Sequence, residues 1–377
     1  MKTKNNLLKG TFWGAALFYF LIAFEFFYMA GPFAAYFYSV YAPTLNFIND
    51  IPILSWLNSF FLPHAVRETS SVIINSHEVI GAIFAIGGFI AFSIGACQVY
   101  YNKLTKKGVV TGGIYNFVRH PQYISFIICS LGLLILWPRY IVLIMFITMI
   151  FAYYMLAKIE ERECIAKFGQ SYINYKNRTN MFLPFSINPF TKFKFPKSIR
   201  KKIMILASIY LAVLLISIGF AKKLQILSIN SLYSVYTENS VNISVCELSD
   251  KKINSIMEII RSDSKVISIL SDFDESTQYV NYILPTEWFA AEIPMNGLKL
   301  RQGHLSPADY ETNLFKVIIT KVIIKGNNVV PSTNFLYNIY RREAIAEIWI
   351  NFSEQKVTQI LDMPENIRYE GVPVAVY

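Results

Sequence analysis

The stretch PQYISFIICSLGLLILWPRYIVLIMFITMIFAYYMLA, from Pro121 to Ala157, decides the fold. It holds two apolar runs, 123–136 and 140–156, which the tripeptide Trp137-Pro138-Arg139 separates. The hydrocarbon core of a bilayer is about 30 Å thick and takes about 20 helical residues to cross. Because the first run is shorter than that, the pattern predicts a tight helical hairpin rather than two independent full spans.

Three further apolar runs, 11–30, 78–100 and 203–220, complete a prediction of about five membrane helices. The first run follows three lysines, as a signal peptide does, but it lacks a clear small-residue cleavage site, which favours a retained span. Glu25 lies inside it, where an ionisable residue is either functional or satisfied by a partner. The segment 51–64 is too short to cross and is expected to lie at a membrane interface.

Charge is divided unequally along the 377 residues, of which 54% are hydrophobic and 16% charged. Residues 1–220 hold 20 of the 35 Lys and Arg but only 7 of the 25 Asp and Glu, so the net charge of +10 belongs to this part. Basic loops stay in the cytoplasm. Five spans then place the N-terminus and the basic segments around 103–119 and 158–202 in the cytoplasm. Everything after 220 lies on the opposite side, and a bacterial inner membrane is favoured over the endoplasmic reticulum.

The second part, 223–377, reads as a soluble α+β domain of unknown role. Apolar residues recur at helical spacing in DKKINSIMEIIRS, 250–262. A strand is expected from Phe315, ending in a Gly-Asn-Asn turn, and EIWINFSEQKVTQIL, 347–361, predicts a hairpin that turns at Ser353–Lys356. The domain shows no catalytic pattern, although it could bind a protein partner.

Several classes of site find no support in the sequence. The four cysteines and four histidines are too scattered for a zinc motif, so no metal site is predicted. No basic face for nucleic acid is evident. The glycine-rich piece GGFIAFSIG, 87–95, lies in the middle of a predicted span and favours helix packing over dinucleotide binding.

Two segments on the basic side carry polar side chains next to apolar runs. One is GGIYNFVRHPQYISF, 112–126, and the other is KIEERECIAKFGQSYINYKNRTNMFLPF, 158–185. If the helix from 140 continues to Phe168, it spans 29 residues, or roughly 44 Å, and Gly169 suits its C-terminal cap. The hairpin returns the chain to one side, so the two segments can meet. A pocket of carboxylates, an arginine, an imidazole and tyrosines suits a zwitterionic aromatic ligand such as S-adenosylmethionine.

Two motifs in these segments also resemble a known family. The first, GxYxxxRHPxY, is matched by Gly113, Tyr115, Arg119, His120, Pro121 and Tyr123. The second, EExxxxxxFGxxYxxYxxR followed by a proline, is matched by Glu160, Glu161, Phe168, Gly169, Tyr172, Tyr175, Arg178 and Pro184. Residues 78–190 are thereby similar to the isoprenylcysteine carboxyl methyltransferase and phospholipid methyltransferase superfamily. The expected domains are a membrane helix and interfacial segment (1–77), this methyltransferase-like core (78–190), a basic linker with the last membrane helix (191–222), and the soluble domain (223–377).

The resemblance implies a cytoplasmic S-adenosylmethionine site and a role for each motif residue. Arg119 and Arg178 would be catalytic, with Arg119 shaping the pocket and Arg178 near the methyl acceptor. The cofactor-binding residues would be Tyr115, His120, Pro121, Tyr123, Glu160, Glu161, Tyr172 and Tyr175. Three positions depart from the family pattern: Ile114 replaces a frequent proline, Ser125 a glycine, and Asn174 a glutamate of the eukaryotic carboxyl methyltransferases. The last departure concerns the acceptor more than the cofactor.

Simpler interpretations exist for the same residues. Arg119-His120-Pro121 can be an interfacial anchor and a helix start, and the paired glutamates can be a solvated helix end. Tyr172 and Tyr175 can be aromatic belt residues.

The sequence therefore predicts a multi-pass membrane methyltransferase that uses S-adenosylmethionine and acts on a lipophilic acceptor. The acceptor could be an isoprenylcysteine carboxylate, a phospholipid amine, a thiol or a quinone-like lipid. One alternative is an NADPH-dependent oxidoreductase like the membrane sterol reductases. The other is a non-catalytic anchor that presents the C-terminal domain as a binding module.

Overall fold

The computed structural model describes residues 34–105, 108–184, 198–296, 304–324, 331, 334–362 and 373–377. The predicted first span at 11–30, with Glu25 and the basic N-terminus, lies outside the described residues. The described chain divides into two compact units, one containing residues 77–220 and the other residues 34–76 with 221–377. We describe each unit by itself.

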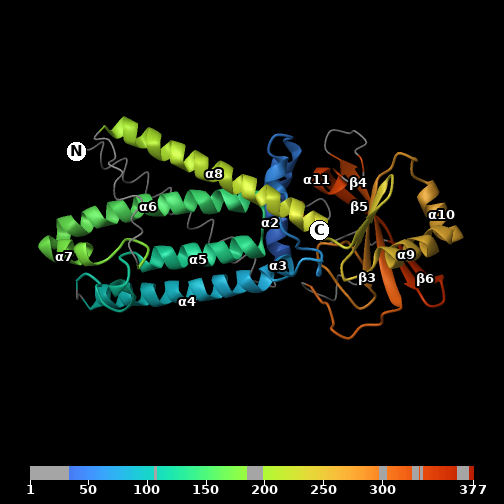
Figure 1. Cartoon of the computed structure of the whole chain (residues 1–377), viewed down its shortest axis with the longest axis horizontal. Helices are drawn as coiled ribbons and strands as arrows, with labels where there is room; N and C mark the ends of the chain where they lie inside the picture. The colour runs from blue at the N-terminus through green and yellow to red at the C-terminus, as the bar shows by residue number, and fades with distance from the viewer. Residues whose placement is uncertain are drawn as a thin grey trace. The chain divides into compact units, whose positions relative to one another are not determined.

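The first unit is helical, and its helices α4, α5 and α6 run side by side (Figure 1). Its elements are α4 (His77–Leu104), η2 (Gly113–Asn116), α5 (Pro121–Leu136), α6 (Tyr140–Phe168), α7 (Gln170–Arg178) and the first two-thirds of α8 (Ile199–Asn230). Helices α5 and α6 form the predicted hairpin. Trp137 is the C-cap of α5, and Arg139 is the N-cap of α6.

Three helices of the described chain are long and apolar enough to cross a membrane. They are Val72–Asn102, Tyr140–Phe168 and Arg200–Asn230, while Pro121–Leu136 is apolar but shorter. Large apolar side chains such as Ile83, Ile86 and Ile90 are exposed on α4, as expected for a helix that faces lipid. A membrane-type helical region is thus confirmed, and the exact number of five spans is not.

Local signals explain the ends of α5 and α6. Pro121 occupies the first turn of α5, where its missing N–H costs nothing. Helix α6 runs for 29 residues and is capped by Gly169, whose φ of 57° is a conformation that glycine adopts without steric cost. Both boundaries agree with the prediction from the sequence.

Glycines allow α4 and α5 to approach closely. A Cβ placed on Gly88 would lie 2.4 Å from the backbone nitrogen of Cys129, and one on Gly132 would lie 2.2 Å from that of Ala85. Gly87, next to Gly88, has nothing within 4 Å of such a Cβ. The contact face therefore depends on small residues, as is usual between membrane helices, and the packing role expected for 87–95 is confirmed for Gly88.

The second unit contains a six-stranded sheet in the order β1-β2-β3-β4-β5-β6. All neighbours are antiparallel except β2 and β3, which are parallel. The strands are β1 (Ser234–Tyr236), β2 (Ser240–Ser244), β3 (Tyr279–Pro285), β4 (Leu314–Ile324), β5 (Ile339–Asn351) and β6 (Lys356–Asp362). The parallel pair requires a crossover, which α9 (Asp250–Ser262) and α10 (Ser264–Ser271) provide.

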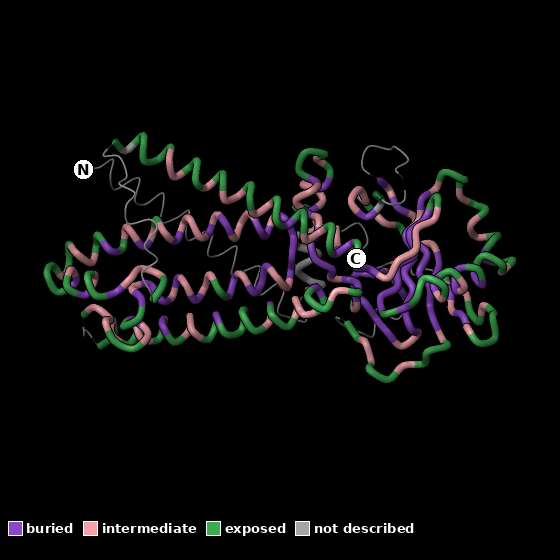
Figure 2. The backbone as a smooth tube through the Cα atoms, viewed as in Figure 1, coloured by how far each residue is buried: buried purple, intermediate pink, exposed green. Residues whose placement is uncertain are grey.

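Helix α9 covers the sheet with the apolar face predicted from its spacing. Ile253, Ile256, Met257 and Ile260 are all buried, and the helix packs against β1, β5 and β6. Figure 2 shows buried backbone along the central strands of this unit, and β2, β3 and β4 are mostly buried. The predicted α+β domain is thus present, with the helix at 250–262 and the hairpin of β5 and β6 as predicted.

An N-terminal segment joins the same unit. It contains α2 (Ala34–Asp50), η1 (Ser55–Asn58) and α3 (Val72–Asn75). Gln225 and Ser228 of α8 donate hydrogen bonds to the carbonyls of Phe60 and Phe61, which are buried. Phe60 and Phe61 are therefore covered by protein, whereas Ile53 is exposed, so the membrane-interface position expected for 51–64 stays a prediction. A short helix α11 (Phe335–Asn338) precedes β5.

Candidate functional site

The two polar segments meet beyond the hairpin, as their places in the sequence predicted. Val118 and Asn180 form an isolated parallel β-bridge. The backbone N–H of Arg119 donates to the carbonyl of Asn180 at 2.8 Å, and that of His120 donates to the carbonyl of Met181 at 3.1 Å. These bonds fix the residues before α5 against the residues after α7.

Glu161 is the centre of a buried ion cluster. Its Oε1 lies 2.7 Å from Nε of Arg119, and its Oε2 lies 2.7 Å from Nζ of Lys176. The Glu161 side chain is 1% exposed. Nη1 of Arg119 also donates to the carbonyl oxygens of Lys176 and Thr179. Arg119 therefore ties α6 to the end of α7, and most of its donors have protein partners.

Glu160 has a different environment from its neighbour. Half of its side chain is exposed, at 50%. Its Oε1 accepts a hydrogen bond from the hydroxyl of Tyr123, and its Oε2 lies 3.5 Å from Nδ1 of His120. The imidazole and the Tyr123 ring are stacked, with centroids 5.5 Å apart and planes 3° apart. Glu160 is thus held by α5 while it remains accessible.

His120 is held between the two glutamates. It is 8% exposed, and its Nε2 lies 3.7 Å from Oε1 of Glu161. Burial alone would lower the pKa of His120, but hydrogen bonds and charges from Glu160 and Glu161 outweigh it, so the pKa is raised. The site thus favours the imidazolium form.

Three tyrosines form a cluster on the other side of the site. Tyr115, Tyr172 and Tyr175 are buried together. The hydroxyl of Tyr175 donates to the carbonyl of Tyr115 at 2.7 Å, and burial raises the pKa of Tyr175 to about 12. Burial also raises the pKa of Tyr115 and of Tyr172. These phenols stay protonated at neutral pH and can donate hydrogen bonds.

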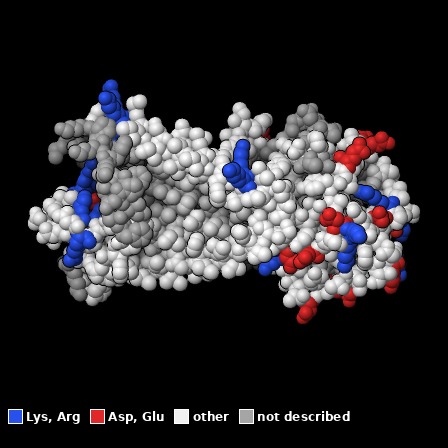
Figure 3. All heavy atoms as spheres, in the orientation of Figure 1, with Lys and Arg blue, Asp and Glu red and all other residues white. Residues whose placement is uncertain are grey.

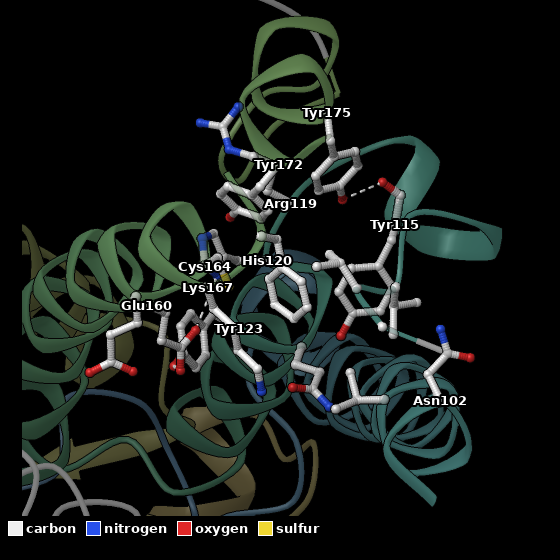
Figure 4. Close-up of a pocket in the computed structure, with 17 residues that line it drawn as sticks. Asn102, Tyr115, Arg119, His120, Tyr123, Glu160, Cys164, Lys167, Tyr172 and Tyr175 are labelled. Carbon is white, nitrogen blue, oxygen red and sulfur yellow. Dashed lines mark hydrogen bonds and ion pairs between the residues drawn. The ribbon is translucent and has the colours of Figure 1, made fainter. Parts of the chain in front are cut away.

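A cavity of about 730 Å³ opens between these groups, within the range of about 300–1,000 Å³ typical of small-molecule sites. Figure 4 shows the labelled side chains around it, with Glu160 contributed by α6 and Asn102 by α4. Its lining consists of Val99, Asn102, Gly108, Val109, Val110, Tyr115, Arg119, His120, Gln122, Tyr123, Glu160, Glu163, Cys164, Lys167, Phe168, Tyr172 and Tyr175.

Most of the residues predicted from the motifs line this cavity. Seven do so: Tyr115, Arg119, His120, Tyr123, Glu160, Tyr172 and Tyr175. Among the described residues, Pro121, Glu161 and Arg178 are outside the lining. Pro121 starts α5, Glu161 pairs with buried cations, and the Arg178 guanidinium lies over the Tyr175 ring, 5.6 Å from its centroid.

The lining also includes polar residues that the sequence analysis missed. Lys167 brings a cation from the end of α6, Asn102 an amide from the end of α4, and Gln122 an amide from the start of α5. Lys167 and Gln122 occupy unspecified positions inside the two motifs. Lys167 follows Glu160 by about two turns of the same helix, a spacing that could have drawn attention to it.

Positive charge gathers near this site. In Figure 3, Lys and Arg atoms cluster toward the end of the helical unit where α7 lies, whereas Asp and Glu atoms appear mainly over the sheet unit. Cations at one end of apolar helices are typical of the cytoplasmic boundary of a membrane protein.

Comparison with known proteins shows what this region is similar to. Residues 78–171 match the phospholipid methyltransferase family. The protein-S-isoprenylcysteine O-methyltransferase of Saccharomyces cerevisiae is 31% identical over 78 residues, which are 20% of this chain and 33% of that protein. The enzyme of the same name from Schizosaccharomyces pombe is 31% identical over 77 residues, with the same shares. No solved structure matches the chain.

The resemblance read from the two motifs is thereby confirmed for the region between α4 and the start of α7. The chain spans about a third of the length of the curated relatives that it matches. The family match ends at residue 171, just before Tyr172 and Tyr175.

Proposed function

We propose that this protein is an integral membrane methyltransferase that uses S-adenosylmethionine to methylate a lipophilic acceptor. One observation carries the proposal: residues of the two motifs surround a cavity with an accessible carboxylate, a protonatable imidazole and buried phenols. The cavity is formed where apolar helices end in a cationic region. These features suit a ligand with an ammonium, a carboxylate and an aromatic base.

Glu160 is the group that would hold the cofactor's ammonium. It is the accessible one of the two glutamates, and Tyr123 and His120 fix its orientation. Glu161 would not contact the ligand, because its two oxygens face Arg119 and Lys176. Its role in the proposal is to place Arg119, which joins the two segments of the site.

Lys167 is the group that would hold the cofactor's carboxylate. Arg119 is less available for this contact, because its guanidinium already donates to Glu161 and to two carbonyls. Lys167 lines the cavity on the same helix as Glu160. The tyrosine cluster and Phe168 offer apolar and aromatic surface for the adenine.

The chemistry requires little beyond positioning. The cofactor, when bound, supplies an electrophilic methyl carbon on a sulfonium. The protein's part is to align the acceptor with that carbon and exclude water, because a well-oriented displacement avoids a large entropic cost. His120 lies between Glu160 and Glu161 and helps to orient Glu160, and Arg178 on Tyr175 is proposed to face the acceptor.

The membrane arrangement belongs to the same proposal. Five spans would place the cavity on the cytoplasmic face, and the acceptor would enter laterally from the bilayer between apolar helices. The sheet unit would then lie on the opposite side, as an accessory or partner-binding module. Cysteine labelling from either side of sealed vesicles tests this sidedness.

Methyl transfer itself tests the activity. Purified protein in vesicles receives S-adenosylmethionine with a labelled methyl group and, separately, phospholipids and a prenylcysteine analogue. The proposal predicts label in a lipid-soluble product with the wild type and a strong loss in Glu160→Gln. Lys158→Gln, on the same helix but outside the described cavity lining, is the matched control and should retain transfer. Transfer that is equal in Glu160→Gln and wild type would contradict the assigned site.

A further inference from the structure

We propose that His64, Glu292 and His304 form a Zn²⁺ site in the sheet unit, separate from the methyltransferase-like cavity. Nε2 of His64 lies 3.5 Å from Oε1 of Glu292, and Nε2 of His304 lies 3.1 Å from Oε2 of the same carboxylate. One donor atom from each residue lies within 4.8 Å of the other two. All three belong to one compact unit.

The distances between the donor atoms of these side chains suit Zn²⁺. Zn²⁺ binds nitrogen and carboxylate oxygen at about 2.0–2.2 Å, so neighbouring ligands of a tetrahedral site lie about 3.3 Å apart. His64 and His304 lie close to this distance from different oxygens of Glu292, 3.5 Å from Oε1 and 3.1 Å from Oε2, and the carboxylate would offer one of these oxygens to the metal. Two imidazoles with one carboxylate favour a transition metal, whereas Mg²⁺ and Ca²⁺ prefer sites made of oxygen alone.

The surrounding chain holds the three side chains in place. The ring of His64 stacks on Phe60, with centroids 5.5 Å apart, and its backbone N–H donates to the carbonyl of Tyr377 at 2.8 Å. Phe289 and Leu305 form an isolated antiparallel bridge with bonds of 2.8 and 2.9 Å. This bridge places His304 beside the turn that carries Glu292.

Arg342 holds the backbone of Glu292 in place through hydrogen bonds. One guanidinium nitrogen donates to the carbonyl of Glu292 at 3.0 Å and to that of Ala375 at 2.9 Å. The other donates to the hydroxyl of Tyr282, which donates in turn to the carbonyl of Val376 at 2.8 Å. Hydrogen bonds of this kind fix the chain around a metal ligand and so hold the ligand in a defined position before metal binds.

The buried Glu292 carboxylate requires a compensating positive charge. Glu292 is 5% exposed, and a buried carboxylate is costly unless a cation compensates it. The described residues that face it are the two imidazoles, which can supply this charge either by protonation or by sharing a metal ion. The metal alternative keeps both imidazoles neutral, which is the form that binds metal.

The exposed side of the cluster leaves room for a further ligand. The His304 side chain is 38% exposed, against 14% for His64. Three protein ligands with one open position are the arrangement of catalytic zinc sites, in which water fills the fourth position. The site would thus present a metal-bound water at the surface of this unit.

Metal content of the full-length protein in detergent tests the proposal. After treatment with a chelator and removal of the chelator, the protein is titrated with Zn²⁺ and analysed by mass spectrometry of the metal. We expect one Zn²⁺ per chain and a rise in the thermal unfolding temperature. Co²⁺ should give the visible absorption of a four-coordinate site. Absence of stoichiometric Zn²⁺ from the wild type would overturn the proposal and leave the cluster as an ion pair.

Ligand variants show whether these residues bind the metal. His304→Ala is the first variant, because its exposed position tolerates truncation, and it should lower Zn²⁺ affinity by at least about 100-fold. His64→Ala and Glu292→Gln should do the same where circular dichroism shows them folded. His77→Ala, in the helical unit, is the matched histidine control and should bind like the wild type. Wild-type affinity in His304→Ala would also overturn the proposal.

Discussion

Nε of Arg119 lies 2.7 Å from Oε1 of Glu161, while the adjacent Glu160 remains half exposed and bonds to Tyr123 instead. Two consecutive glutamates of one motif therefore have separate tasks. Glu161 holds the two segments of the site together. Glu160 remains available to a ligand.

Replacing each glutamate by glutamine should separate these tasks. Glu161→Gln leaves Arg119 and Lys176 without their carboxylate, and breaking a buried pair costs about 3–5 kcal/mol. We expect a loss of about 2–4 kcal/mol in the free energy of unfolding, because Lys176 remains one-third exposed. Glu160→Gln should change stability much less and weaken ligand binding. Denaturant titration in detergent measures both, and equal destabilisation would contradict the division of roles.

The stability of the site should depend on pH through His120. Its folded-state pKa is raised above the ordinary value of about 6.5. A raised pKa stabilises the folded state fully below the unfolded pKa, and that stabilisation is lost as pH rises through the folded pKa. The stability advantage of the wild type over His120→Gln should therefore be largest near about pH 6 and shrink toward about pH 9. Thermal unfolding of both across this range is the measurement, and an advantage that grows with pH would refute it.

Two neighbouring glycines of α4 offer a matched test of helix packing. Gly88→Ala places a methyl group 2.4 Å from the backbone nitrogen of Cys129, whereas Gly87→Ala meets nothing within 4 Å. We expect Gly88→Ala to destabilise by about 1–3 kcal/mol. Gly87→Ala should be neutral or stabilise by up to about 1 kcal/mol, since alanine is the better helix former. Tryptophan fluorescence during thermal unfolding would reveal the difference, and identical curves would argue against the close α4–α5 contact.

Lys167 should contribute to binding of the cofactor's carboxylate alone. Lys167→Gln is expected to weaken binding of S-adenosylmethionine by about 10-fold. This loss corresponds to about 1.4 kcal/mol, which is reasonable for one exposed charge-assisted hydrogen bond. Binding of methylthioadenosine, which lacks the carboxylate, should be unchanged. Calorimetric titration of both ligands measures this difference. A parallel loss for both would place Lys167 elsewhere in the site.

Strong periodicity made several elements predictable. The apolar spacing of 250–262 gave α9 with its buried face, and Gly169 marked the end of α6. Strands β2 and β3 were missed because their interiors contain polar residues. Asn242 and Asn281 are buried opposite each other, and the amide of Asn281 donates to Asn242 at 2.8 Å. A sequence pattern cannot show that such residues form a hydrogen bond with each other inside a sheet.

The site was predictable in its parts and less so in its arrangement. The motifs indicated that the residues around Arg119 and Glu160 would meet. They could not indicate which glutamate faces the cavity, because consecutive helical residues point about 100° apart and the neighbours decide the rest. Lys176, which completes the Glu161 cluster, occupies an unspecified motif position. The cluster of His64, Glu292 and His304 joins distant segments that no local spacing relates.

The measurement that tests the central claim most directly is cofactor binding to the purified protein in detergent. S-adenosylmethionine, its demethylated product and NADPH are titrated against the wild type, Glu160→Gln and His120→Ala, with Lys158→Gln as the control. The account predicts saturable binding of the first two ligands to the wild type and the control, and strongly weakened binding to both site variants. Binding of NADPH alone, or S-adenosylmethionine binding that is unchanged in Glu160→Gln and His120→Ala, would contradict it.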